Sequence, residues 1–232
     1  MERMAPAAGQ FTAYGPSHWA VLVLTVLGAA ALVLTGRYAD PRLVRRCRQV
    51  LAVVILVLNV GMEIVVFDPA QPLHTLPLQL SDLAPYASAY ALWTRRPWAF
   101  ALTFYWCLTL STQALLTPVL SGPDFPSAAF LAFFTIHVLV IWAAIFLTWG
   151  VGLRPSWRGY WFTVLVTVCW AAAMLAFNAL AGSNYGFLNA KPSTESLLDL
   201  LGPWPWYLLP ETALVLGAWA LLTLLGRRRA TS

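Results

Sequence analysis

The chain has 232 residues, of which 60% are hydrophobic and 10% are charged, and its formal net charge is +5. Its mean hydropathy is +0.71. This composition excludes a soluble globular protein and is typical of a polytopic membrane protein whose apolar residues face lipid. The anionic headgroups at a membrane surface are a sufficient partner for the positive charge, so nucleic acid is not an expected partner.

Windows of about 20 apolar residues predict an all-α polytopic membrane protein with seven transmembrane helices, forming a single domain over residues 1–232. The windows are roughly 17–36, 50–67, 76–94, 98–118, 127–149, 159–181 and 205–226. The second and third are short or interrupted. The residues before the first window lack a basic region followed by a cleavage site, so we expect the first helix to remain as an anchor rather than to be removed as a signal peptide.

Arginine marks one side of the predicted membrane. Short cytoplasmic loops retain Lys and Arg, whereas translocated loops do not. Twelve of the 14 basic residues follow the first, third, fifth or seventh window, and only Arg3 and Lys191 fall on the other side. This pattern predicts an N-terminus outside and a cytoplasmic C-terminus. The twelve residues are Arg37, Arg42, Arg45, Arg46, Arg48, Arg95, Arg96, Arg154, Arg158, Arg227, Arg228 and Arg229.

Polar or ionisable side chains interrupt the hydrophobic windows, and the topology places nearly all of them in the same outer half of the membrane. Each would cost a few kcal/mol at the bilayer centre unless it faced another polar group or a wet cavity. A shared depth therefore predicts a shared cavity. The residues are Glu63, Ser81, Asp82, Gln113, His137 and Asn178.

The third window begins with two prolines around a serine. Pro77 suits the first turn of a helix, whereas Pro85 has no N–H and leaves the carbonyl of Ser81 without its helical partner. We expect a local break at Pro85 that presents the Ser81 hydroxyl to a cavity. The alternative is a kinked helix whose serine bonds its own backbone.

His137 is the only histidine well inside a predicted helix. Imidazole is the natural general base near neutral pH, so Ser81 and His137 are the candidate catalytic pair. A rise of 1.5 Å per residue puts Ser81 about 7 Å and His137 about 15 Å from the outer surface, which allows contact without requiring it. The alternative is a neutral histidine bonded to a neighbouring helix.

A carboxylate behind the histidine would complete a triad. Asp82 points about 100° away from Ser81 on a helix, which makes it a poor third member. Glu63 and Glu211 remain possible, either as that member or as structural partners of Lys191.

Two amide side chains, Gln113 and Asn178, lie within the predicted helices. Gln113 and Asn178 fit interhelical hydrogen bonds better than catalysis, although an amide can also stabilise an oxyanion. His18 and His74 are expected at the solvated outer surface. No spacing of His, Cys, Asp or Glu indicates a metal, and no glycine-rich loop indicates a nucleotide, so neither a metal nor a cofactor is expected.

Several motifs occur together along most of the chain. They are the run from Leu76 to Tyr86 that includes Gln79, Gln113 with Thr117-Pro118, His137, Asn184-Tyr185, Lys191-Pro192 and Asp199 to Tyr207. These motifs resemble the bacterial YwaF-type integral membrane family, which is related to the mammalian transmembrane-protein-164 proteins. The resemblance implies a phospholipid acyltransferase in the bacterial plasma membrane, with a cysteine nucleophile where this chain has Ser81. A serine hydroxyl depends more on a positioned base than a thiol does, so this difference makes His137 more important.

The sequence therefore predicts an intramembrane lipid acyltransferase or lipid esterase with Ser81 as nucleophile and His137 as base. A looser similarity to the androgen-induced-gene hydrolases, which use a threonine and a histidine on fatty esters, is compatible with a hydroxyl nucleophile. We expect phospholipids or fatty esters as partners, with Asn184 and Lys191 near a headgroup. No protein partner can be inferred. The alternative is a transporter or lipid-binding protein in which Glu63 or Asp82 is essential.

Overall fold

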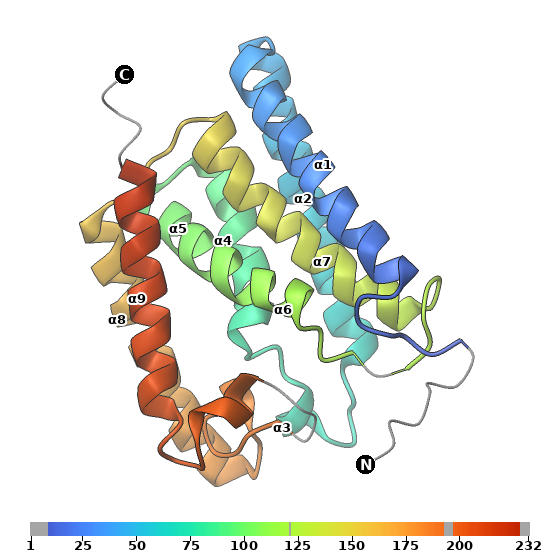
Figure 1. Ribbon diagram of the computed structural model, residues 1–232, viewed down its shortest axis with the longest axis vertical. Coiled ribbons are helices and arrows are strands. Elements are labelled where there is room, and N and C mark those ends of the chain that lie inside the picture. The colour runs from blue at the N-terminus through green and yellow to red at the C-terminus, as the bar shows by residue number, and fades with distance from the viewer. Residues whose placement is uncertain (1–8, 121, 193–196, 228–232) are drawn as a thin grey trace.

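The computed structural model describes residues 9–120, 122–192 and 197–227, which form a bundle of helices (Figure 1). These residues contain no strand, only an isolated bridge between Gln10 and Pro123. Six helical segments are long and apolar enough to cross a membrane, in agreement with the all-α membrane fold predicted from composition. They are Pro16–Tyr38, Pro41–Val66, Pro97–Leu116, Ala128–Gly150, Trp157–Ala181 and Leu208–Gly226.

The six segments contain all the long helices, and shorter helices lie between them. The third predicted window corresponds to a helix of only 15 residues, α4. The elements are α1 (Pro16–Tyr38), α2 (Pro41–Val66), α3 (Pro72–Thr75), α4 (Leu80–Thr94), α5 (Pro97–Leu102), the π-helix η1 (Thr103–Ser111), α6 (Thr112–Leu116), α7 (Ala128–Ile145), the π-helix η2 (Phe146–Gly150), α8 (Trp157–Ala181), the 3₁₀ helices η3 (Tyr185–Phe187) and η4 (Leu197–Leu201), and α9 (Leu208–Arg227).

Helix α2 begins earlier than its hydrophobic window, at Pro41 rather than near residue 50. The Asp40 side chain caps its N-terminus by accepting from the Arg42 N–H at 2.7 Å, and Pro41 takes the first helical position. Arginines that the sequence placed in a loop after the first helix therefore lie in the first turns of α2. Helix formation here follows from capping rather than from apolar character.

Helix α4 begins later than expected and is not broken. Pro77 lies outside any helix, so the prediction that it opens the third helix was wrong. The predicted break at Pro85 was also wrong, because α4 runs through it continuously. The hydrogen bond that Pro85 lacks is one of the first in the helix, and close packing against α2 supports the remaining turns. The irregular backbone lies before α4, at residues 76–79.

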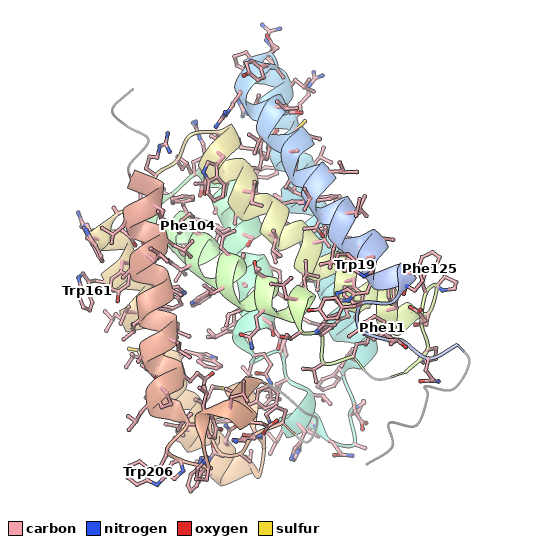
Figure 2. The ribbon with its side chains drawn as sticks, viewed as in Figure 1. Phe11, Trp19, Phe104, Phe125, Trp161 and Trp206 are labelled. Carbon is pink, nitrogen blue, oxygen red and sulfur yellow. The ribbon has the colours of Figure 1, made fainter. Side chains whose placement is uncertain are left out.

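The segment from α5 to α6 contains a π-helical stretch, η1. Hydroxyl groups take up backbone carbonyls there, since Thr103 donates to Ala99 O at 2.9 Å and Thr109 donates to Tyr105 O at 2.6 Å. Such stretches are uncommon and occur often at functional sites. Together, α5–α6 and α7–η2 form the centre of the bundle, because 61% of the residues in the 18-residue apolar window of each are buried, against 6% for α1. Figure 2 shows Phe104 inside the bundle and Trp161 on its periphery.

Arginine side chains gather at one end of the bundle, where they bond the last carbonyls of other helices. Arg37 donates to Trp149 O at 3.0 Å, Arg48 to Leu92 O at 2.6 Å and Arg154 to Gly226 O at 3.5 Å. A cation at a helix C-terminus complements both the free carbonyls and the helix dipole. We call this the arginine end; it confirms that these basic residues share one side. Arg3, Arg228 and Arg229 lie outside the described residues.

His18 is fully buried, which corrects the expectation of a solvated histidine. Its Nδ1 accepts from the Tyr14 N–H at 2.8 Å, and its Nε2 bonds Leu115 O at 2.7 Å. Nδ1 is therefore the acceptor and Nε2 carries the hydrogen. His18 thus joins the start of α1 to α6 at the end opposite the arginines.

His18→Leu is expected to lower the free energy of unfolding by about 2–4 kcal/mol, because one buried N–H and one buried carbonyl lose their partner. Thermal unfolding in detergent measures the change. His74→Leu is the control, because His74 is exposed and its bond to Gly182 O is long, at 3.3 Å. Equal melting temperatures for the two variants would contradict a structural role for His18.

Candidate functional site

A cavity of about 420 Å³ lies within the bundle, towards the end opposite the arginines. Its walls come from the start of α4, from η1 and α6, and from α7, α8 and α9. Residues 183–192, which include η3, complete the lining, and we call them the covering segment. Its volume is within the range of about 300–1,000 Å³ typical of ligand pockets. The sequence predicted a cavity shared by polar side chains from several helices; the structure has such a cavity, and α9 and the covering segment complete its lining.

Helix α9 forms one wall of the cavity. Its second half is held by hydrogen bonds from Trp219 Nε1 to Thr109 Oγ1 at 3.1 Å and between Tyr105 OH and Thr223 Oγ1 at 2.7 Å. Side chains of α9 from Leu208 to Trp219 line the cavity, and Glu211 is among them. The hydrogen bonds of Trp219 and Thr223 therefore hold this wall against η1.

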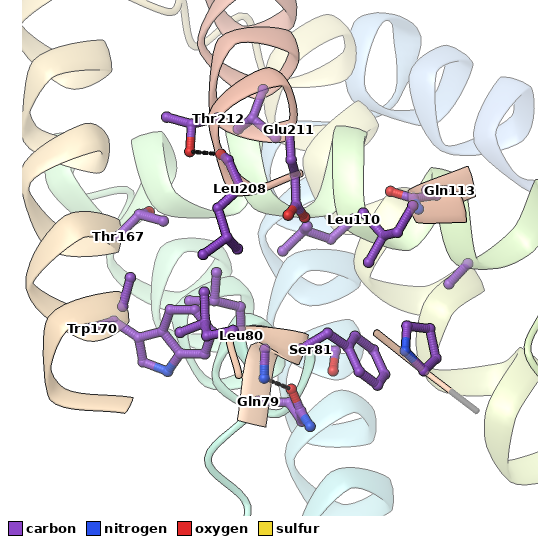
Figure 3. A pocket seen from close by; sticks show the side chains of 18 of the residues that line it. Gln79, Leu80, Ser81, Leu110, Gln113, Thr167, Trp170, Leu208, Glu211 and Thr212 are labelled. Atoms are coloured by element: carbon purple, nitrogen blue, oxygen red, sulfur yellow. Dashed lines mark hydrogen bonds between the residues drawn. The ribbon is translucent and has the colours of Figure 1, made fainter. Parts of the chain in front are cut away.

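Eight polar side chains line this otherwise largely apolar cavity. Gln79, Thr117, Thr167 and Thr212 form hydrogen bonds with other groups of the protein. The other four come from four helical segments and are Ser81, Gln113, His137 and Glu211. Figure 3 shows Ser81, Gln113 and Glu211 around a common space, with Leu110 drawn between Glu211 and Gln113 and with Leu80 and Leu208 on the side of Trp170.

Among the described residues, none of these four side chains has a hydrogen-bond partner. Polar groups in an apolar setting are normally bonded, so these four are available to a polar group of a bound molecule.

Ser81 and His137 therefore share one cavity, although no direct hydrogen bond joins them. The His137 ring packs edge-on against Phe133, with ring centroids 4.8 Å apart. Catalytic hydrogen bonds often form only when substrate is bound, so the missing bond does not exclude a catalytic pair. The depths estimated from the helical rise allowed Ser81 and His137 to lie in one cavity, and both residues line it.

The two glutamate candidates occupy different places. Glu211 lines the cavity, whereas Glu63 lies between α2 and α4. There the Glu63 carboxylate accepts from Asn59 Nδ2 at 2.7 Å and from Tyr86 OH at 2.5 Å. Of the two carboxylates, only Glu211 lines the same cavity as Ser81 and His137.

Asp82 and Gln79 organise the start of α4. The Asp82 carboxylate accepts from the Gln79 N–H at 2.9 Å, which caps the helix, and Asp82 does not line the cavity. Gln79 lines the cavity and its Oε1 accepts from the Gly186 N–H at 2.8 Å. Gln79 therefore connects α4 to the segment that covers the cavity.

Asn178 holds the covering segment. Its amide donates to Tyr185 O at 3.0 Å and to Asn189 Oδ1 at 2.9 Å, and it accepts from the Tyr185 N–H at 2.8 Å and from Ser183 Oγ at 2.9 Å. Asn178 is 2% exposed and lies outside the cavity. The sequence analysis expected Asn178 to form hydrogen bonds between helices. Its hydrogen bonds are instead to the covering segment.

Gly186 is a site residue that the sequence analysis missed. Its φ is +69°, and a Cβ there would lie 2.4 Å from the Trp170 ring, so only glycine fits without displacing the tryptophan. The Trp170 ring is itself fixed by a 2.8 Å hydrogen bond from Nε1 to Leu78 O. The cover over the cavity therefore depends on a glycine whose neighbours in sequence give no sign of this contact.

Asn178→Ala is expected to abolish hydrogen-exchange protection of the Tyr185 amide, because that N–H loses its acceptor. Exchange measured by mass spectrometry on peptides from residues 183–190 tests this. The control is Asn59→Ala, which removes an amide that bonds Glu63 elsewhere in the molecule. Protection that survived in Asn178→Ala would show that the covering segment is held by other contacts.

Asn184 and Lys191 lie in the covering segment and already have partners. Asn184 Oδ1 accepts from the Asn189 and Ala190 N–H groups, both at 3.1 Å. Lys191 Nζ lies 3.5 Å from Asp199 and 5.8 Å from the centre of the Tyr207 ring. The ion-pair partner of Lys191 is thus Asp199, not either glutamate considered from the sequence. Within the described ranges, no three His, Cys, Asp or Glu side chains gather as metal ligands.

The fold and the cavity define a helical membrane protein with a largely apolar site between its helices. Residues 13–223 match the TMEM164 family, and the chain belongs to that family. An uncharacterized protein of Treponema pallidum (strain Nichols) is 31% identical over 187 residues, which cover 79% of this chain and 77% of that protein. The resemblance predicted from the motifs is therefore confirmed, and a bacterial relative is among the matches. No solved structure matches the chain.

Proposed function

We propose that the protein is a lipid acyltransferase or lipid esterase that uses Ser81 as nucleophile and His137 as base. The observation that carries this proposal is the cavity, in which a hydroxyl and an imidazole from different helices line an apolar space without other partners. An apolar wall suits an acyl chain, and the polar groups suit an ester. The family resemblance, which implies acyl transfer on phospholipids, supports the same reaction.

The proposed reaction has two halves. Ser81 Oγ attacks the ester carbonyl while His137 takes its proton, and collapse of the tetrahedral intermediate expels the lysolipid oxygen, which receives that proton. Water or the hydroxyl of a second lipid then attacks the acyl-serine while His137 takes its proton, the bond from the acyl group to Ser81 Oγ breaks, and Ser81 Oγ receives that proton. In this proposal the Gln113 amide donates to the oxyanion and Glu211 stabilises the charged imidazole.

The membrane arrangement that we propose has seven crossings, with the short helix α4 as the third. The N-terminus then lies outside and the arginine end faces the cytoplasm of a bacterial plasma membrane. The cavity opens towards the outer leaflet in this orientation. Lys191 and Asn184, in the covering segment, are then near the phosphate of a bound phospholipid.

Transport is less well supported by the geometry. A transporter was expected to use free backbone groups at a break in α4 and to need Glu63 or Asp82. Helix α4 is continuous at Pro85, and neither carboxylate lines the cavity. The acyl-transfer proposal uses only groups that do line it.

Labelling with an alkyl fluorophosphonate tests the proposal. Protein in lipid nanodiscs would be treated with the probe, digested and mapped by mass spectrometry. An adduct on Ser81 is expected, because only a base-activated hydroxyl reacts at an appreciable rate. An adduct spread over several hydroxyl residues, with none enriched at Ser81, would contradict the assignment.

A further inference from the structure

A second hollow lies on the outside of the bundle, in the groove between α2 and α4. It has a volume of about 600 Å³, and aromatic side chains line it, including Tyr90 and Trp93, which are 44% and 54% exposed. Its floor is made of Ala52 and Ala89, at 1% and 2% exposure. Small residues allow the two helices to approach closely there, while the larger residues form the rims of the groove.

The groove has two different ends. Towards the cavity end of the bundle, Tyr86 donates to Glu63 at 2.5 Å and so connects the two helices. Towards the arginine end, the lining stops at Ala52 on α2 and Thr94 on α4. Ala52 lies one turn from Arg48, and Thr94 is next to Arg95. The largely apolar groove therefore ends close to arginine residues of both helices.

Three arginines converge at that end. Arg48 is 7% exposed and uses one N–H on Leu92 O. Arg45 lies three residues earlier on the same face of α2, and both Arg45 and Arg95 interact electrostatically with Arg48. In the described parts of the chain, none of the three forms an ion pair with a carboxylate. Converging positive charges without a counter-ion attract an anion.

We propose that this face binds one anionic phospholipid, whose phosphate contacts Arg45, Arg48 and Arg95 and whose acyl chain lies in the groove between α2 and α4. A guanidinium has five N–H donors, and Arg48 spends only one on Leu92, so donors remain for phosphate oxygens. Basic pockets between transmembrane helices are typical sites for anionic headgroups. The exposed aromatic rims make a lipid a better occupant than a free phosphate or a peptide, because they continue the apolar surface that faces the membrane.

This site is independent of the proposed reaction. The lining of the groove shares no residue with the cavity around Ser81, and α4 contributes to the two from different turns. A lipid here would fasten α4 to α2 at the arginine end. It is a structural ligand, so its binding does not depend on the activity of Ser81.

Native mass spectrometry of the detergent-solubilised protein tests the proposal. Phosphatidylglycerol and phosphatidylcholine with identical chains are added separately. The wild-type protein is expected to retain one phosphatidylglycerol at least about tenfold more tightly than phosphatidylcholine. Equal retention of the two lipids would overturn the proposal.

The double variant Arg45→Gln/Arg95→Gln is expected to lose that preference, with phosphatidylglycerol affinity reduced about tenfold or more. Arg48 is left in place because it caps α4. The control is Arg46→Gln, which removes one positive charge from the opposite side of α2, about 200° around the helix from Arg48. Unchanged phosphatidylglycerol retention in the double variant, or equal losses in the double variant and the control, would overturn the role of the cluster.

A second pair of variants tests the groove. Val53→Trp fills it from its rim and is expected to reduce phosphatidylglycerol retention about tenfold, whereas Val57→Trp adds the same bulk to an exposed position outside the lining. If Val53→Trp retained the lipid normally, the arginines would form a simple anion site that inorganic phosphate also occupies, and the lipid assignment would be wrong.

Discussion

Ser81→Ala is expected to reduce the turnover of a phospholipid ester by at least about 10³-fold, because the nucleophile is removed and the remaining cavity groups only bind and orient the substrate. The fold should remain intact, since the Ser81 hydroxyl has no hydrogen-bond partner among the described residues whose loss could destabilise α4. Release of fatty acid or of lysolipid in nanodiscs, followed by mass spectrometry, measures the change.

The matched control is Ser88→Ala, the same substitution in the same helix. Ser88 is fully buried, donates to Ala84 O at 2.7 Å and contacts Cys107 Sγ at 3.2 Å, outside the cavity. It should cost about 1 kcal/mol of stability and leave turnover unchanged. Ser81→Cys should keep measurable turnover, because a thiol is an equally placed nucleophile. Full activity in Ser81→Ala would exclude Ser81 as nucleophile.

His137→Ala is expected to lower turnover by about 10²–10⁴-fold and to slow fluorophosphonate labelling of Ser81 in parallel, because a serine hydroxyl needs a base to react. Added imidazole should restore part of the labelling, since removal of the side chain leaves a space beside Phe133. A purely structural histidine would show no such rescue.

The control for this variant is His74→Ala, which removes an exposed imidazole at the same end of the bundle and outside the cavity. Its turnover and labelling should equal those of the wild type. If His137→Ala labelled as fast as the wild type while remaining folded, the base would have to be another group, and Glu211 would be the first to test.

Much of the fold was predictable because hydrophobic length is a strong signal. The windows for five long helices agree with the structure within a few residues, and the arginines gather at one end as their loop positions predicted. The start of α2 was not predictable from hydropathy, because its first turns are rich in arginine and are stabilised by the Asp40 cap. The start of α4 was missed because the interruption lies before the helix instead of at Pro85.

The site was predictable in part, because depth along a helix does not determine the direction of a side chain. Ser81, Gln113 and His137 reach one cavity, whereas Glu63, Asp82 and Asn178, assigned to the same layer, bond elsewhere. The directions depend on where each helix begins and on how the helices pack against one another. Neither has a sequence signal as clear as hydrophobic length.

The most direct test of the central proposal is the mass of the protein during turnover. Nanodisc-embedded protein would be mixed with a long-chain p-nitrophenyl ester, quenched with acid within the first turnovers, and analysed intact and after digestion. The expected result is a burst of nitrophenol together with one acyl group on the peptide that contains Ser81, both absent from Ser81→Ala. Steady ester turnover without any acylated peptide, or with the acyl group on another residue, would contradict Ser81 as the nucleophile.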